Sequence, residues 1–265
     1  MSSFVAVQAP PGAALKVYDR GKRHNVQPAE ENLPPTFLDA MSVREDVYVD
    51  EQSVPLENEF DPDDQQSFHW VVYASVSTAG SNGADGAERR SSSGGKLPVG
   101  TVRIVLPPHV HDEESHNEGP DMAGPREGQD AEALGCLRRG DEPYVRMGRL
   151  AVLKPYRKMG LSSLLVNAAL EYASNHPDEI VPPVSPTATE QRRIETGASD
   201  NQGEWNGLVL VHAQSAIEKL WRTWGFVRDQ TMGEWNEEGI MHVGMWRRIT
   251  VLRRRGSIMG PLSPI

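Results

Sequence analysis

The chain has 265 residues, of which 38% are hydrophobic, enough for one large domain with a sizeable core. Lys and Arg total 27 and Asp and Glu total 37, so the formal net charge is −10. Acidity of this kind argues against general nucleic-acid binding, which needs a basic surface, and suits a cationic ligand. The single cysteine, Cys136, excludes an internal disulfide and a CxxC metal pair.

Targeting and membrane signals are not visible in this sequence. The N-terminal residues lack a basic start followed by a long apolar run, so we expect no secretory signal. No apolar stretch approaches the ~18 residues that span a membrane. We therefore expect no membrane association and a cytoplasmic location, with the nucleus as an open alternative.

Three polar segments interrupt the patterned part of the chain. They cover residues 78–96, 107–142 and 177–206 and are rich in Gly, Ser, Pro and charged residues. Such segments bury too little apolar surface to offset the entropy of ordering them. We expect surface insertions in a single domain spanning 1–265, with its core at about 36–248 and a tail at 249–265. The second segment holds His109, His111 and His116, but we expect no metal site there.

Helices and strands alternate in the remaining residues. Helical spacing of apolar residues predicts helices, and β-branched runs predict strands. In chain order we expect a helix at 36–47, strands at 69–76, 99–106 and 144–153, a helix at 161–174, a strand at 208–213, a helix at 216–224, and strands at 226–228 and 242–248. This order indicates an α/β domain with a mixed sheet.

The loop between residues 153 and 161 has the composition of an anion site. A strand ends at Pro155, and Arg157-x-x-Gly160-x-Ser162 leads into a helix. The first N–H groups of a helix are unpaired and carry partial positive charge, and a glycine lets a phosphate approach the backbone. The pattern is neither a P-loop nor a dinucleotide-binding fingerprint. An ordinary strand–turn–helix joint is the alternative interpretation.

This loop resembles the Q/R-x-x-G-x-G/A loop with which GNAT acetyltransferases hold the pyrophosphate of CoA. Five other stretches resemble this family, and its ElaA-type branch in particular, in order and spacing. They are Val43-Arg44 through Glu51-Gln52, the acidic run 59–64 followed by His69, Val99-Gly100 through Arg103, Ala213-Gln214 with Trp224-Gly225-Phe226, and residues 237–245. The sequence is thus identified as a member of the GNAT family.

The resemblance implies a mixed, mostly antiparallel sheet flanked by helices and splayed between its fourth and fifth strands. It also implies acetyl-CoA as co-substrate, with the pantetheine arm running along the fourth strand. The backbone N–H near Leu150 would polarise the thioester carbonyl. The residues that would contact CoA are Leu150, Ala151, Val152, Arg157, Lys158, Met159, Gly160, Leu161, Ser162, Ser163, Ser215 and Trp221.

Proton transfer is the point at which this sequence departs from the family. GNAT enzymes often carry a tyrosine acid four residues before Gly225, where this chain has Trp221, whose indole has no usable acidity. Candidate bases are Glu51, His69, His212 and His242, because histidine and carboxylate side chains can take the proton of an ammonium group. Each could instead be a structural or solvated residue, and a water chain could replace any of them.

The acceptor pocket is expected to involve Glu51, Gln52, His69 and Gln214. The acidic loops favour a small primary amine, such as an amino sugar or a polyamine, as acceptor. Two alternatives remain open, a protein lysine or N-terminal acetyltransferase and a GNAT protein that binds CoA without catalysis. A homodimer is possible.

Overall fold

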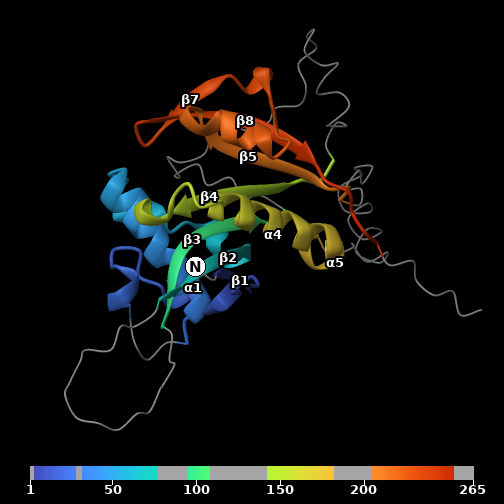
Figure 1. Cartoon of the computed structure of the whole chain (residues 1–265). Coiled ribbons are helices and arrows are strands. Elements are labelled where there is room, and N and C mark those ends of the chain that lie inside the picture. Colours follow the sequence, from blue (N-terminus) through green and yellow to red (C-terminus); the bar gives the residue numbers. More distant parts are fainter. Residues whose placement is uncertain (1–2, 28–31, 77–94, 108–141, 182–204, 254–265) are drawn as a thin grey trace, which may run out of the picture.

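The computed structural model describes residues 3–27, 32–76, 95–107, 142–181 and 205–253. Eight strands in this part of the chain form one sheet, in the order β1-β2-β3-β4-β5-β8-β6, with β7 also paired to β8 (Figure 1). Their bounds are β1 Ser3–Gln8, β2 Ser67–Val76, β3 Gly95–Val105, β4 Val145–Val152, β5 Leu208–Gln214, β6 Val227–Arg228, β7 Glu234–Glu237 and β8 Ile240–Arg248. Only β4 and β5 are parallel.

The longest helices cover the two faces of this sheet. Helix α1 (Pro35–Arg44) has a proline in its first turn, where a missing N–H does no harm, and continues into the π-helical segment η3 (Glu45–Glu51). Helix α4 is Leu161–Asn175. The shorter helices are α2 (Leu56–Glu59), α5 (Pro177–Ile180) and α7 (Glu218–Thr223), and the 3-10 turns include η4 (Pro62–Gln66) and η6 (Ser215–Ile217).

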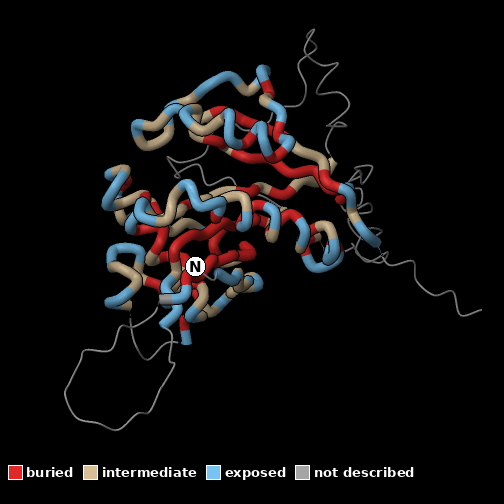
Figure 2. Tube along the Cα trace, viewed as in Figure 1, coloured by how far each residue is buried: buried red, intermediate tan, exposed pale blue. Residues whose placement is uncertain are grey.

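Alternation along β2 shows how the sequence separates the two faces. Val71 and Tyr73 pack with Ala40 of α1, whereas Trp70 and Val72 belong to the large cluster beneath α4. Because successive side chains of a strand point to opposite faces, one β-branched and aromatic run serves both layers. Figure 2 shows the buried residues concentrated along the central strands and the faces that the helices turn toward them.

Strands β4 and β5 form the fork on which the site depends. They pair only from Val145↔Val209 to Met147↔Val211, and then diverge. On the other side of β4, Thr101 pairs with Ala151 but Arg103 pairs with Gly148, so β4 holds one extra residue. This bulge coincides with a positive φ of 50° at Arg149. The expected mixed sheet, splayed between its fourth and fifth strands, is therefore confirmed.

Several element boundaries differ from the sequence-based prediction. Strands β1 and β7 were not predicted, so the folded core begins well before residue 36. The third polar segment is shorter than expected, because Ile180 and Trp205 are buried at its two ends. The last strand is followed by Ile249, whose N–H donates to the carbonyl of Gly207 at 2.8 Å, so the start of the expected tail is part of the fold.

Most of the predicted insertions, the histidines at 109, 111 and 116, and Cys136 lie outside the described residues. None of the helices in the described ranges is long and apolar enough to cross a membrane. The same ranges contain no group of three or more His, Cys, Asp or Glu side chains arranged to hold a metal ion.

Candidate active site

A cavity of about 510 Å³ lies where β4 and β5 diverge. Its lining includes Gly148–Val152 from the bulged arm of the fork, His212–Gln214 from the other arm, and Val47 and Tyr48 from η3. Backbone that has left a sheet ladder carries N–H and C=O groups available to an extended ligand. The predicted pantetheine-binding residues Leu150, Ala151 and Val152 all line this cavity.

The helix start beside this fork has the geometry predicted for a phosphate site. Gly160 is the residue before α4 and has a φ of +78°, which a side chain would strain, and a Cβ added there would meet no atom within 4 Å. Lys158 also has a positive φ, of 63°. The space beside Gly160 is therefore open at the start of the 15-residue helix α4, where the helix has no side-chain N-cap. Within this turn, Met159 is exposed, Leu161 is buried, and Ser163 Oγ accepts from Trp224 Nε1 at 3.1 Å.

Arg157 and Glu51 form an ion pair with each other. Both terminal nitrogens of Arg157 donate to the Glu51 carboxylate at 2.6 Å, and its Nε donates to the carbonyl of Val152 at 2.9 Å. The hydrogen bond from Arg157 lowers the pKa of Glu51 below its usual value. Glu51 does not line the cavity, and its engaged carboxylate is a weak base. This pair joins η3 to the loop before α4.

Two of the candidate bases line the cavity. His212 is the first residue of β5 after its last pair with β4, and its ring meets Trp235 edge-to-face with centroids 4.9 Å apart. His242 pairs with Gln214 across β5 and β8. Its Nδ1 lies 2.9 Å from the carbonyl oxygen of Ile240. A carbonyl only accepts, so Nδ1 carries the proton and Nε2 holds the lone pair in the neutral form.

His69 lies away from the cavity, in the core beside α1. It is 1% exposed, meets Phe37 edge-to-face, and its Nε2 is 3.1 Å from the carbonyl oxygen of Asp64. Burial lowers its pKa to about 4, so it is neutral at physiological pH. Ser215, another residue predicted to contact CoA, follows β5, and its buried Oγ has no hydrogen-bond partner in the described part of the chain.

Three hydrogen bonds narrow the cavity from the side of α1. Gln214 Nε2 donates to Gln52 Oε1 at 2.9 Å, which joins the two predicted substrate-binding amides across the fork. Asn58 donates to Glu238 of the β7–β8 turn at 2.7 Å. The hydroxyl of Tyr48 donates to the carbonyl of Leu150 at 3.0 Å, directly at the bulge.

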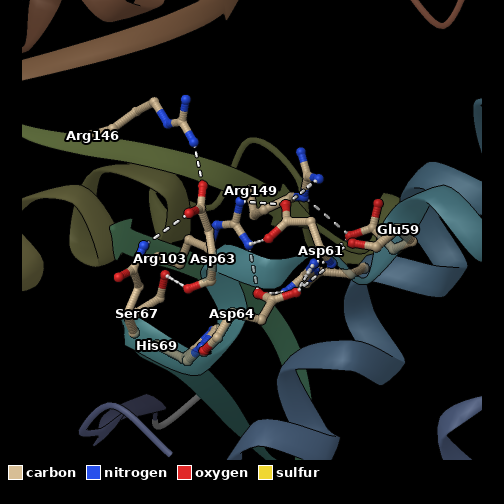
Figure 3. Close-up of polar contacts among 11 residues, drawn as sticks. Glu59, Asp61, Asp63, Asp64, Ser67, His69, Arg103, Arg146 and Arg149 are labelled. Carbon is tan, nitrogen blue, oxygen red and sulfur yellow. Dashed lines mark hydrogen bonds and ion pairs between the residues drawn. The ribbon is translucent and has the colours of Figure 1, made fainter. Parts of the chain in front are cut away.

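A network of buried ion pairs forms one wall of the cavity (Figure 3). Asp64 accepts from Arg44 at 2.7 Å and from Arg103 at 2.6 Å. The other members are Asp61, held by Arg103 and Arg149, Asp63, held by Arg146, and Glu59, held by Arg44. Four carboxylates thus meet four guanidinium groups, and the acidic run 59–64 adds no net negative charge to the wall.

These arginines keep the carboxylates ionised although they are buried. Burial opposes ionisation of Asp64, but Arg44 and Arg103 hold its pKa well below the usual range. The pKa of Asp61 is also lowered, against the effect of burial, chiefly by Arg103. These ion pairs were missed by the sequence analysis because the arginines are remote in sequence from the acidic run. Arg44 comes from α1, and the other three come from β3 and β4. The signal in the strands was an arginine within a mostly apolar run, at Arg103 in β3 and at Arg146 and Arg149 in β4.

Trp221 occupies the position of the expected tyrosine and lines the cavity. It is 3% exposed, and its ring is fixed edge-to-face against Trp224 and Phe226, each with centroids 5.1 Å away. Its buried Nε1 has no hydrogen-bond partner among the described residues. A buried donor without a partner is costly, and a ligand can supply the missing acceptor.

A sheet that forks at a bulged strand, with a helix starting beside the fork, is the arrangement that the resemblance to GNAT acyltransferases predicted. The model of the GNAT acetyltransferase family matches residues 48–181, which is half of the chain. This chain belongs to that family and is an acyltransferase. Family membership implies a CoA derivative as co-substrate.

Solved structures with related folds include an acyl-CoA N-acyltransferase from Pseudomonas aeruginosa, at 16% identity and a TM-score of 0.44, with 93% of this chain and 99% of that chain covered. Escherichia coli ElaA is 14% identical, with a TM-score of 0.41 and coverage of 92% and 100%. A CoA-dependent acyl-homoserine lactone synthase, BjaI, is 13% identical, with a TM-score of 0.46 and coverage of 92% and 82%. No curated protein sequence matches this chain.

Proposed function

We propose that this protein is an acetyl-CoA-dependent N-acetyltransferase that acetylates the primary amine of a small molecule. The observation that carries the proposal is the fork itself, because its bulged arm and its other arm with His212 line one cavity, together with Arg157 from the loop that leads into α4. The diphosphate of CoA would bind the N–H groups from Lys158 to Ser163. The pantetheine arm would then follow the backbone from Val152 to Leu150.

The reaction is a direct attack on the thioester. His212 takes a proton from the acceptor ammonium, whose pKa is near ~10.4 for lysine-like amines. The free amine nitrogen forms a bond to the thioester carbon, and the carbonyl oxygen is stabilised by backbone N–H near Leu150. The C–S bond then breaks, CoA leaves as a thiolate, and the nitrogen loses its second proton to water. A thiol pKa of about 8.5 makes this departure possible without an acid at Trp221.

Two hydrogen bonds across the fork support a small acceptor over a protein. The Gln52–Gln214 and Asn58–Glu238 hydrogen bonds both join the α1 side of the cavity to the β5–β8 side. A peptide lying across the fork would have to separate these pairs, whereas a small amine fits beside them. His242, with its lone pair on Nε2, is the alternative base.

Release of free CoA tests this function. The panel contains acetyl-CoA with glucosamine, glucosamine 6-phosphate, polyamines, aralkylamines, amino acids and a lysine peptide. Acetyl-dependent release with a small amine supports the proposal. Release with the lysine peptide alone would contradict it, and tight acetyl-CoA binding without any release would favour a protein that binds CoA without catalysis.

A matched pair of glycine variants tests the diphosphate site. Gly160→Ala adds a methyl group at a φ of +78°, at the start of α4. Gly12→Ala makes the same change at a φ of +55°, where an added Cβ also meets no atom within 4 Å. We expect acetyl-CoA affinity, measured by calorimetry, to fall about tenfold or more in the first variant, or ~1.4 kcal/mol, and to be unchanged in the second. Equal affinities in both would contradict the placement.

A further inference from the structure

Gly148 is a glycine that the backbone does not require. It lies inside β4, its φ is not positive, and a Cβ added to it would meet no atom within 4 Å. Glycine in the middle of a strand is destabilising relative to alanine, because more backbone entropy is lost on folding. Neither strain nor a close neighbour explains the missing side chain. What its absence leaves is open space on the cavity wall, since Gly148 lines the cavity.

This space opens at the fork and on the face that carries the ion pairs. Gly148 follows Met147, the last β4 residue paired with β5, and His212 follows Val211, the last β5 residue paired with β4. Met147 and Val211 both belong to the core cluster beneath α4. Because side chains alternate along a strand, Gly148 and His212 both turn to the opposite face. The candidate base therefore shares a face with the open position.

The walls of this space are charged, which limits what can occupy it. Gly148 pairs with Arg103 on β3, and Asp61, Asp63 and Arg146 line the same cavity. An aliphatic chain placed against these groups would leave them desolvated without new partners. A polycation finds Asp61 and Asp63 already bound by guanidinium groups. The acidity of this loop therefore no longer favours a polyamine.

Of the arginines that line the cavity, all but Arg20 form ion pairs with carboxylates among the described residues. The lining contains five arginines, namely Arg20, Arg103, Arg146, Arg149 and Arg157, and three carboxylates, namely Asp61, Asp63 and Glu237. Arg20 is exposed at the side of the cavity formed by the N-terminal segment, and its Nε donates to the carbonyl of Glu57 at 2.8 Å. Within the described ranges its guanidinium has no carboxylate partner, so it is available to an anionic group.

We propose that the space beside Gly148 is the acceptor subsite and that it takes a small amine that also carries a carboxylate, such as an α-amino acid. This inference rests on the proposed function. The amine lies beside Gly148 within reach of His212, and the carboxylate lies toward Arg20. The missing side chain at position 148 sets the size of the acceptor that fits.

Paired substrates test the class of acceptor. Each amino acid is compared with the amine that lacks its carboxylate, for example phenylalanine with phenethylamine and lysine with cadaverine, at saturating acetyl-CoA. We expect kcat/KM to be at least tenfold higher for the amino acid, and Arg20→Gln to remove most of that preference. Equal rates for both members of each pair, or a preference for the polyamine, would overturn the inference while leaving the acetyltransferase function intact.

Size variants test the position. Gly148→Ala and Gly148→Val should raise the acceptor KM, by tenfold or more for valine, while the affinity for acetyl-CoA in calorimetry changes less than twofold. Gly95→Ala in β3 is the matched control, because its added Cβ also meets no atom within 4 Å and it does not line the cavity. A change in acyl-chain selectivity with an unchanged acceptor KM would assign the space to the donor instead.

Binding without turnover separates this inference from the proposed function. Calorimetry with CoA already bound measures the affinity for the amino acid directly. If the amino acid binds the wild-type protein and not Gly148→Val, but no acetyl group is transferred, the subsite stands and the acetyltransferase proposal fails. If neither variant nor wild type binds it while other amines are acetylated, the subsite is wrong and the acetyltransferase proposal stands.

Discussion

Replacing Asp64 by asparagine should destabilise the fold severely. The Asp64 side chain is fully buried and accepts hydrogen bonds from Arg44 at 2.7 and 3.1 Å and from Arg103 at 2.6 Å. Asparagine keeps the shape but removes the charge, so two buried guanidinium groups share one carboxylate fewer. Breaking a buried ion pair typically costs about 3–5 kcal/mol, a large fraction of the about 5–15 kcal/mol that stabilises a domain.

Urea unfolding followed by circular dichroism measures this loss. The matched control is Asp19→Asn, which breaks a 2.9 Å ion pair with Lys22 at the surface, where screened pairs contribute little. Acid titration adds a second readout. Because the pKa of Asp64 is lowered in the folded state, its stabilisation is present above the unfolded pKa of about 3.9 and is lost as the pH falls below it. The reasoning would be refuted if Asp64→Asn lost no more free energy of unfolding than Asp19→Asn, or if it left the fall in stability at acid pH unchanged.

Three further predictions concern the histidines and the tryptophan. His212→Gln should lower kcat by about 10²–10⁴-fold with unchanged acetyl-CoA affinity, because glutamine cannot take the ammonium proton; a normal kcat would move the base to His242. Trp221→Phe should weaken CoA binding, because the buried Nε1 donor is lost, and unchanged CoA affinity would show that this N–H needs no ligand. Trp221→Tyr should still bind CoA and should add an alkaline limb near ~10 to the pH profile of activity. His69 has a pKa of about 4 in the folded protein, against an ordinary 6.5. The free energy of unfolding should therefore fall by about 3 kcal/mol as the pH falls from 6.5 to 4, at ~1.36 kcal/mol per pKa unit. His69→Leu should remove this pH dependence in urea unfolding.

Local patterns sufficed for the elements that depend on neighbours in sequence. The helix at Leu161–Asn175 has apolar residues at helical spacing. The loop before it has a glycine, Gly160, at a position with a positive φ. The fork and bulge of β4 were expected from the resemblance to GNAT proteins, not from periodicity. Strand β1 was missed because Ser3–Gln8 is a short, half-exposed edge strand whose partner, β2, lies 60 residues later.

The charged residues were harder to place, because their partners are remote in sequence. The acidic run 59–64 suggested a cationic ligand, yet its carboxylates bind arginines from α1, β3 and β4. Glu51 is a candidate base in the sequence, but in the structure its carboxylate accepts hydrogen bonds from Arg157, which is 106 residues away. His69 looks like a site residue in the sequence but is packed against Phe37. Burial and long-range pairing, which decide each of these roles, leave no trace in a single sequence.

Amide hydrogen exchange with and without acetyl-CoA tests most directly whether the β4–β5 fork holds the co-substrate. We predict slower exchange on binding at two segments, the bulged arm from Leu150 to Val152 and the helix start from Lys158 to Ser163, because their N–H groups would bond to the pantetheine arm and the diphosphate. Unchanged exchange at both segments under saturating acetyl-CoA, or protection confined to another part of the chain, would contradict the account.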